Sequence, residues 1–246
     1  MLDERVAFIA AVFVLAGLVK GVIGLGLPTI SMGLLALAMP PLQAAAILVL
    51  PSFLTNVWQI LAGPALKAAA LRLWPMMLGI CLGTWSGAGL MNGSDSRYTG
   101  TFLGVALMAY AATGLGSIRF TIGRTQEAWL GPAAGVLTGL VTAATGVFVL
   151  PAVPYLQGVG LEKEELVQAL GMSFTVSTLA LTVNLARAGA LDVTLAGPTL
   201  AALGMAAAGM WLGQTLRSRL PPEIFRRCFF GGLLLLGAYL VVAAWR

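Results

Sequence analysis

The sequence predicts an all-α, polytopic integral membrane protein with about eight hydrophobic segments arranged in two repeats. Three observations support this prediction. Of the 246 residues, 59% are hydrophobic and 9% are charged, with a mean hydropathy of +0.94, whereas about a quarter of the residues in a soluble domain are charged. The apolar residues form long runs joined by short links, and two of these runs are interrupted by glycine-rich stretches.

This composition excludes several classes of protein. So few charged residues could not cover the surface of a soluble enzyme, and the apolar content is too high for a disordered chain. The 14 basic and 9 acidic residues give a net charge of +5. The basic residues stand singly or in pairs in short loops, which is typical of topology signals and not of a nucleic-acid-binding patch. We therefore expect the lipid bilayer, and no nucleic acid, to be the partner of this chain.

The first four segments fall within residues 1–120. The run 6–38 follows the charged N-terminal residues and is longer than one crossing requires. We expect a retained membrane segment there, because no small-residue cleavage site of a signal peptide ends a short run. The next three runs, 43–61, 73–91 and 99–118, are each about the 20 residues that a helix needs to cross about 30 Å of hydrocarbon.

The last four segments fall within residues 121–246. The run 128–154 begins after Glu127, and the run 166–186 follows an acidic loop and ends before Arg187. The run 193–216 is bounded by Asp192 and Arg217, and the run 225–245 ends the chain before Arg246. None of the links between runs is long enough to hold a domain outside the membrane.

Two runs are expected to be broken. The first contains the glycine-rich stretch 21–28, which leaves pieces of 6–20 and 28–41 that are each too short to span. The fifth contains the stretch 139–146 and closes with Pro151 and Pro154. Glycine and proline make a helix hard to sustain, and unpaired backbone at membrane depth is tolerated only inside protein or beside a cavity. Each break is therefore either a re-entrant turn or an unwound point that lines a pathway.

The breaks reveal an internal repeat. The pair Gly17 and Gly21 recurs as Gly135 and Gly139, and a helix that opens with Gln-Ala follows each break, at Gln43 and at Gln168. We expect two halves, 1–120 and 121–246, within one membrane domain, each made of a broken run and three helices. Paired interruptions at corresponding positions point to a site between two repeats.

The basic residues indicate an orientation if both broken runs turn back. If every run crosses once, the two sides of the membrane carry almost equal numbers of basic residues. If the broken runs return to the side they entered, one side carries Arg5, Arg97, Arg187 and Arg246, and the other carries Lys67, Arg72, Arg119, Arg124, Lys163, Arg217, Arg219, Arg226 and Arg227. The positive-inside rule then places both termini on the periplasmic side and makes the two halves inverted copies.

Lys20 is the one charged residue that does not fall in a loop or at a segment end. A lysine within hydrocarbon costs about 3 kcal/mol on insertion scales and usually marks a pathway. The alternatives are that it reaches an interface or pairs with a loop carboxylate. A helix that starts near Pro28 would add free N–H groups and a positive dipole end beside Lys20, which favours a negative ligand.

Further polar residues at the breaks and in two apolar runs complete the expected substrate site. The alternatives are that the glycines serve only close packing and that single hydroxyls bond between helices. The candidate substrate-binding residues are Lys20, Gly24, Gly26, Pro28, Thr29, Gln43, Asn56, Gln59, Thr138, Thr142, Thr145, Gln168, Ser173 and Ser177.

No catalytic, metal or cofactor site is expected. The chain contains no histidine, and its two cysteines, Cys81 and Cys228, have no CxxC spacing. No aspartate or glutamate lies in the middle of a segment, so a buried carboxylate relay for protons has no candidate. These absences count against a membrane-embedded enzyme.

Two copies of a glycine-rich broken helix in an eight-segment chain of this size resemble the sulfite exporter TauE/SafE family of bacterial membrane proteins. The matching stretches are 17–28 and 135–151, together with the helix starts at Gln43 and Gln168. The resemblance implies transport of sulfite, sulfonates or carboxylates across the bacterial inner membrane. The family's glycine cluster is thinned here, to 24–28 in the first half and to 142–146 in the second.

The expected function is therefore a carrier for a small anion that works by alternating access between the two halves. An anion-selective channel and a non-transporting membrane assembly subunit are the alternatives. Self-association into a homo-oligomer is possible in each case.

Overall fold

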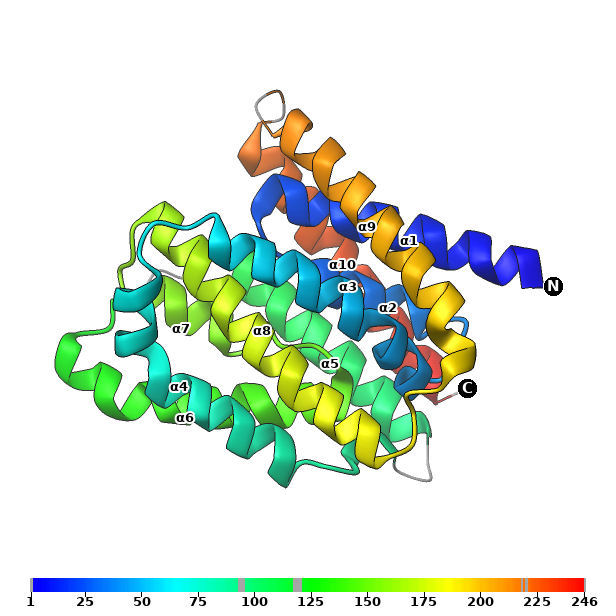
Figure 1. Cartoon of the computed structure of the whole chain (residues 1–246), viewed down its shortest axis with the longest axis horizontal. Helices are drawn as coiled ribbons and strands as arrows, with labels where there is room; N and C mark the ends of the chain where they lie inside the picture. Colours follow the sequence, from blue (N-terminus) through cyan, green and yellow to red (C-terminus); the bar gives the residue numbers. More distant parts are fainter. Residues whose placement is uncertain (1, 93–95, 117–120, 218, 220, 246) are drawn as a thin grey trace.

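The chain forms a bundle of helices in a computed structural model that describes residues 2–92, 96–116, 121–217, 219 and 221–245. Arg119 and Arg246, which enter the orientation argument, lie outside the described residues. No strand occurs in these ranges. Figure 1 shows the long helices lying side by side, with the start of the first and the end of the last on the same side of the bundle.

The prediction of eight membrane-length segments is confirmed for the described residues. Eight helices are long and apolar enough to cross a membrane, and α2 and α7 are much shorter. The helices are α1 (Leu2–Ile23), α2 (Leu27–Leu35), α3 (Pro41–Leu61), α4 (Leu66–Ser86), α5 (Ser96–Leu115), α6 (Arg124–Thr145), α7 (Ala152–Gly158), α8 (Lys163–Arg187), α9 (Ala196–Leu216) and α10 (Pro222–Ala244), with 3-10 turns at Leu90–Asn92 and Val193–Leu195.

The helices with the closest contacts form four pairs, which are α1 with α9, α4 with α6, α5 with α10, and α3 with α8. Each pair combines one helix from residues 1–120 with one from residues 121–246. The two halves are therefore interleaved, and neither half packs mainly against itself.

Glycines form the contact surface in three of these pairs, including that of α5 with α10, where Gly104 and Gly237 face one another. A side chain added at Gly17 or Gly21 would overlap carbonyl oxygens of α9, at Ala206 and Met210. In the same way, a side chain at Gly135 or Gly139 would overlap carbonyl oxygens of α4. Small residues allow two helix backbones to approach this closely in a membrane. The packing role considered for these glycines is confirmed.

The first break begins at Gly24, inside the predicted stretch 21–28 but three residues after its start, and the prediction that both adjoining pieces are too short to span is wrong for the first of them. Helix α1 continues through Lys20 and Gly21 and ends at Ile23, so it has 22 residues. The chain leaves the helix at Gly24 and Gly26, whose φ angles are +80° and +107°. Gly21 does not break the helix because it packs on α9.

The second break is also displaced. Helix α6 runs without interruption through the stretch 139–145, and the expected break there is wrong. The helix ends at Gly146, which has a φ of +70°, and residues 147–151 lead into α7. Gly139 instead packs against α4. The absence of a side chain at this position allows the two helices to touch and does not unwind α6.

After each break the chain turns back. The Nε2 of Gln59, near the end of α3, donates to the carbonyl of Gly24, at the end of α1, over 2.8 Å. Helices α1 and α3 therefore end at the same level, and α2 with residues 36–40 carries the chain back between them. In the second half, the N–H of Ile122, just before α6, donates to the carbonyl of Gly158, at the end of α7, over 2.8 Å.

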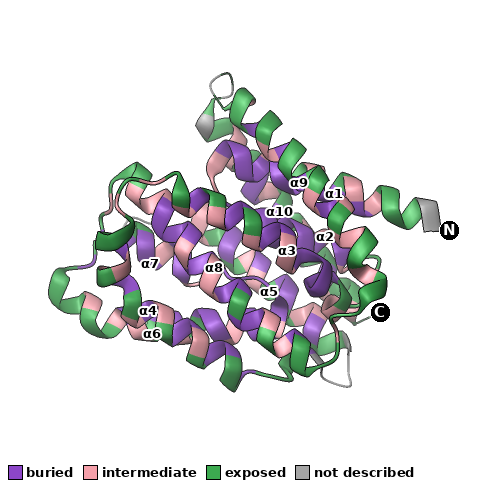
Figure 2. Ribbon diagram, in the orientation of Figure 1, coloured by how far each residue is buried: buried purple, intermediate pink, exposed green. Residues whose placement is uncertain are grey.

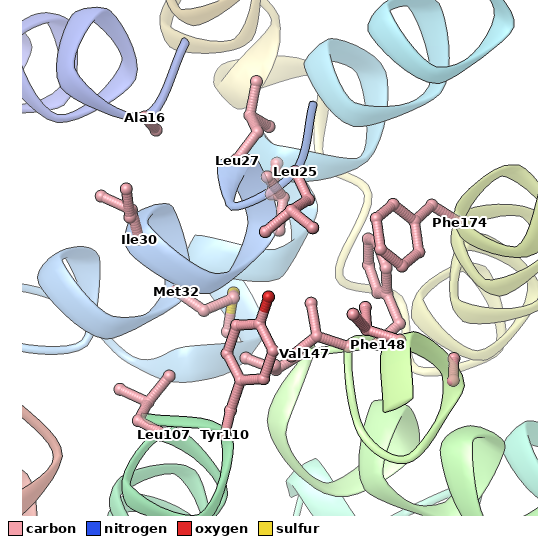
Figure 3. Packing of buried hydrophobic residues seen from close by; sticks show 14 of the residues in the cluster. Ala16, Leu25, Leu27, Ile30, Met32, Leu107, Tyr110, Val147, Phe148 and Phe174 are labelled. Atoms are coloured by element: carbon pink, nitrogen blue, oxygen red, sulfur yellow. The ribbon is translucent and has the colours of Figure 1, made fainter. Parts of the chain in front are cut away.

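The core lies around α2 and the inward faces of α3 and α8, where Figure 2 shows the buried residues. Figure 3 shows Leu25, Met32, Val147, Phe148 and Phe174 meeting in this core from α2, α8 and the two breaks. Large apolar side chains such as Trp58, Leu71, Trp74, Trp211 and Leu235 are exposed on the outside of the bundle. Such a surface suits lipid, not water.

Candidate functional site

Lys20 lies in the last turn of α1, and its side chain points into the protein. The residue is 3% exposed, and Nζ donates to Oγ1 of Thr55 over 3.1 Å and to Oδ1 of Asn56. Both acceptors are neutral groups on α3. No ion pair among the described residues involves Lys20, so its charge is buried without a carboxylate partner.

The two acceptors are held in place by further hydrogen bonds. The hydroxyl of Thr55 donates to the carbonyl of Pro51 over 2.7 Å, which leaves the Thr55 oxygen free to accept from Lys20. The Nδ2 of Asn56 donates to Oγ of Ser52 over 3.2 Å, which turns Oδ1 toward the lysine. The Ser52 hydroxyl lies 3.3 Å from that of Thr178 on α8. We call Lys20, Ser52, Thr55, Asn56 and Thr178 the Lys20 cluster, and it links α1, α3 and α8.

The first break adjoins the Lys20 cluster. Gln59, one turn beyond Thr55, donates to the carbonyl of Gly24 and, over 3.1 Å, to that of Val167 on α8. Gly26 is the N-cap of α2, and Pro28 lies in the first turn of this helix, as expected. Helix α2 has no side-chain cap, Pro28 has no N–H, and the N–H of Ile30 donates to the carbonyl of Gly26, so the free N–H groups of its first turn are those of Leu27 and Thr29.

Several buried polar side-chain atoms have no hydrogen-bond partner in the described part of the chain. Leaving such a group unpaired costs about 1–3 kcal/mol, so a concentration of them points to a ligand or to ordered water. They are Oγ1 of Thr29, Oγ of Ser31, Oε1 of Gln59, the hydroxyl of Tyr110, Oγ of Ser173, Oγ of Ser177 and Oδ1 of Asn184. Of the candidate residues, Thr29, Gln59, Ser173 and Ser177 thus each keep a free polar atom.

Ser173, Ser177 and Asn184 lie on one face of α8, at spacings of four and seven residues. Asn184 donates from Nδ2 to the carbonyl of Thr84 over 2.7 Å, so this face is directed toward α4. A cavity of about 20 Å³ lies beside Asn184 and Leu181, which is room for about one water molecule.

The three candidate threonines of α6 are placed differently from what was expected. The hydroxyls of Thr138, Thr142 and Thr145 donate to the carbonyls of Ala134, Thr138 and Val141, each over 2.7 Å. This is the usual back-bonding of a threonine within a helix. Because the stretch 139–145 is helical, its amides bond within α6 and are not available to an anion.

Two of the three candidate glutamines, Gln43 and Gln168, have no part in the Lys20 cluster. Gln43 is exposed in the first turn of α3, more than three turns before Thr55. Gln168 is buried and joins the end of α3 to the start of α4: its Nε2 donates to the carbonyl of Ile60 over 2.7 Å, and its Oε1 accepts from the N–H of Ala65 over 2.8 Å. Both polar ends of Gln168 are therefore used by the backbone.

Tyr110 and Ser31 carry free hydroxyls that sequence reasoning did not select. Tyr110 is 2% exposed on α5, and Figure 3 shows its hydroxyl directed toward Met32 and Val147. Phe229 packs edge-on against Tyr110 and also lies against Gly26, so the tyrosine is one ring away from the first break. The signal in the sequence that could have identified Tyr110 is the presence of a tyrosine within an otherwise apolar run.

A partly buried ion pair stabilises the junction of α4, α6 and α7. Arg72 donates from Nε and Nη2 to both carboxylate oxygens of Glu127, over 2.8 Å and 2.6 Å. Its Nη2 also donates to the carbonyl of Val159 over 3.1 Å, which holds the end of α7 against α4. In the described ranges, no group of three histidine, cysteine, aspartate or glutamate side chains is arranged to hold a metal ion.

Eight membrane-length helices around two interrupted segments are the architecture of a membrane transporter. Residues 9–240 match the sequence model of the Sulfite exporter TauE/SafE family, and the chain belongs to this family. The protein is thus a multi-pass membrane transporter of a family that handles sulfite and related anions, and the resemblance inferred from the sequence is confirmed. No curated protein and no solved structure matches the chain significantly.

Proposed function

We propose that this chain is an inner-membrane carrier that binds a small anion of the sulfite, sulfonate or carboxylate type at the Lys20 cluster. The observation that supports this most strongly is the buried amino group of Lys20, whose partners in the described chain are neutral. An ammonium has three N–H donors, and two are used by Thr55 and Asn56. The third hydrogen is available to an anion, which would also neutralise the buried charge.

The first break can supply further groups to such an anion. The free N–H groups at the start of α2 form the positive end of the helix dipole. Thr29, in the same turn, keeps its hydroxyl without a partner. An oxyanion needs several donors around its oxygens, and a helix start, hydroxyls and one cation provide a set of that kind. Sulfite, sulfonates and carboxylates all present oxygens that could accept from them.

The arrangement of the helices supports alternating access between two inverted repeats, 1–120 and 121–246. The closest helix pairs each combine one helix from each half, and the Lys20 cluster reaches from α1 and α3 to Thr178 in the second half. A site at the interface of two halves can open to either side when one half moves against the other. With the positive-inside rule, both termini would face the periplasm.

Anion flux into proteoliposomes tests this proposal. Purified protein is reconstituted and offered sulfite, methanesulfonate, sulfoacetate and acetate, with Lys20→Gln and Lys67→Gln measured in parallel. Lys67 is exposed at the start of α4, so its variant controls for the loss of a positive charge. We expect wild type and Lys67→Gln to transport at least one of the sulfur oxyanions with counterflow, and Lys20→Gln to be slower by about tenfold or more.

Other outcomes would contradict the proposal. A folded Lys20→Gln variant that transports like wild type would remove the anion-binding role of the lysine. Flux without counterflow that saturates only at high concentration would indicate a channel. If wild type moves none of the four anions, a non-transporting assembly subunit would be the better interpretation.

A further inference from the structure

We propose that Lys20 also carries the proton that moves with the anion, so that the lysine is charged while the anion is bound and neutral while the site is empty. This inference rests on the proposed anion-carrier function and concerns what drives it. It makes the transporter a proton–anion symporter whose coupling group is a lysine, although symporters of this kind commonly use buried carboxylates.

The hydrogen bonds of Lys20 fit both protonation states. A neutral amine has two N–H donors, and the structure provides two acceptors, Thr55 Oγ1 and Asn56 Oδ1. The ammonium has a third donor, which lacks an acceptor in the described chain until an anion arrives. The empty site therefore satisfies both N–H donors of the neutral amine, and the loaded site satisfies the three donors of the ammonium.

Among the described residues, no other ionisable group forms an ion pair or a hydrogen bond with Lys20. The helices α2 and α9, which pack against α1, and α3, which carries both hydrogen-bond partners of Lys20, contain no acidic, basic, cysteine or tyrosine side chain. The other charged residues of α1 lie in its first turns, at the opposite end. Three further helices lie near the first break, and their ionisable groups are Arg97, Tyr98 and Tyr110 on α5, Lys163, Glu164, Glu165 and Arg187 on α8, and Glu223, Arg226, Arg227, Cys228 and Tyr239 on α10. Within the described chain, the polar contacts of Lys20 are with Thr55 and Asn56.

The charges balance through the transport cycle. On the side of release, the pair of ammonium and monoanion dissociates into the free anion, a proton that passes to water, and the neutral amine. The N–H bond that breaks leaves its electron pair on Nζ. On the side of uptake, the amine takes a proton from water as the anion binds. A monoanion and a proton thus cross together, and neither the loaded nor the empty site carries a net charge at this position.

Substitution by arginine separates this proposal from simple anion binding, because arginine remains protonated. Wild type, Lys20→Arg and Lys67→Arg are reconstituted, the membrane potential is clamped with potassium and valinomycin, and labelled methanesulfonate and sulfite are used as probes. Net uptake into anion-free vesicles and exchange against internal unlabelled anion are measured separately. Methanesulfonate is the decisive probe, because its charge does not change with pH.

For wild type, we expect an inward proton gradient of one pH unit to accelerate net uptake by about tenfold, with one proton entering per methanesulfonate. In Lys20→Arg, net uptake should fall by about tenfold or more relative to exchange in the same variant, whereas Lys67→Arg should keep the wild-type ratio of net uptake to exchange. Net uptake by Lys20→Arg at the wild-type rate would overturn the proposal.

The wild-type measurements test the coupling even if Lys20→Arg does not fold. Net uptake that is indifferent to the proton gradient, or that occurs without proton entry, would overturn the symport while leaving the anion carrier intact. If wild type transports neither probe in either mode, the proposed function itself fails, and the coupling fails with it.

Discussion

The side chain of Met32, on the short helix α2, lies against Gly146, where α6 ends and the second break begins. Its Cγ, Sδ and Cε atoms occupy the space that a side chain on Gly146 would need. The two breaks therefore meet in the core, one from each half of the chain. A movement at one break would have to displace the other, because the interior between them is packed with Leu25, Val147 and Phe148.

We expect Gly146→Ala to destabilise the protein more than Gly160→Ala does. The two glycines have similar φ angles, +70° and +73°, but only Gly146 has a neighbour in the way. The shared strain costs about 1 kcal/mol, and displacing Met32 adds about 1–3 kcal/mol. Thermal unfolding in detergent measures the difference. Equal losses for the two variants would mean that Met32 is not held against Gly146.

The glycine contact between α1 and α9 predicts that Gly17→Ala is damaging. The new methyl group would overlap the carbonyl oxygen of Ala206, so the two helices must separate. Gly204, on α9, has open space around it, and Gly204→Ala should stabilise its helix by about 0.5–1 kcal/mol. The yield of monodisperse protein and its melting temperature report both effects. A Gly17→Ala variant as stable as wild type would show that this close approach is not needed.

Tyr110→Phe separates binding from folding. The hydroxyl has no partner in the described chain, so its removal should leave stability unchanged or slightly higher. If the hydroxyl donates to the anion during transport, KM rises by about tenfold, since a hydrogen bond to a charged group is worth about 1.5–3 kcal/mol. Tyr239→Phe, at an exposed position of α10, is the matched control. An unchanged KM together with unchanged stability would exclude Tyr110 from the substrate path.

Cysteine labelling tests the orientation. In a variant without Cys81 and Cys228, single cysteines replace Arg187, between α8 and α9, or Arg217, between α9 and α10; both positions are exposed. With periplasmic termini, a membrane-impermeant maleimide added to intact cells labels the cysteine at 187 and spares that at 217. The reverse pattern would invert the protein, and labelling of both would contradict the assignment of α9 as a crossing helix.

The helical bundle and the position of Lys20 could be predicted from the sequence because both depend on hydropathy, which is a property of each residue type. The residues at which each helix ends could not be predicted exactly. In a sequence, a glycine that ends a helix cannot be distinguished from one that allows a neighbouring helix to approach. Gly21 and Gly139 lie against neighbouring helices, whereas Gly24 and Gly146 end helices, and only the packed structure distinguishes the two roles.

The hydroxyls of the candidate site illustrate the same limit. Thr142 and Ser177 are both small polar residues in apolar runs, yet Thr142 bonds to its own helix and Ser177 has a free oxygen. The sequence cannot decide which acceptor a side-chain rotamer reaches. Tyr110 was missed for a related reason: the partners that its hydroxyl lacks become visible only when the surrounding helices are in place.

The free polar atoms around the core have a thermodynamic consequence for the purified protein. Each of them makes the empty state less stable than it would be with a partner, so an anion that supplies partners must shift the unfolding equilibrium by mass action. At about a hundred times Kd, the gain is about 2.7 kcal/mol, which corresponds to several degrees in Tm. The rise in Tm therefore detects binding of the cognate anion, and a library of anions can be ranked by this rise before any vesicle is prepared.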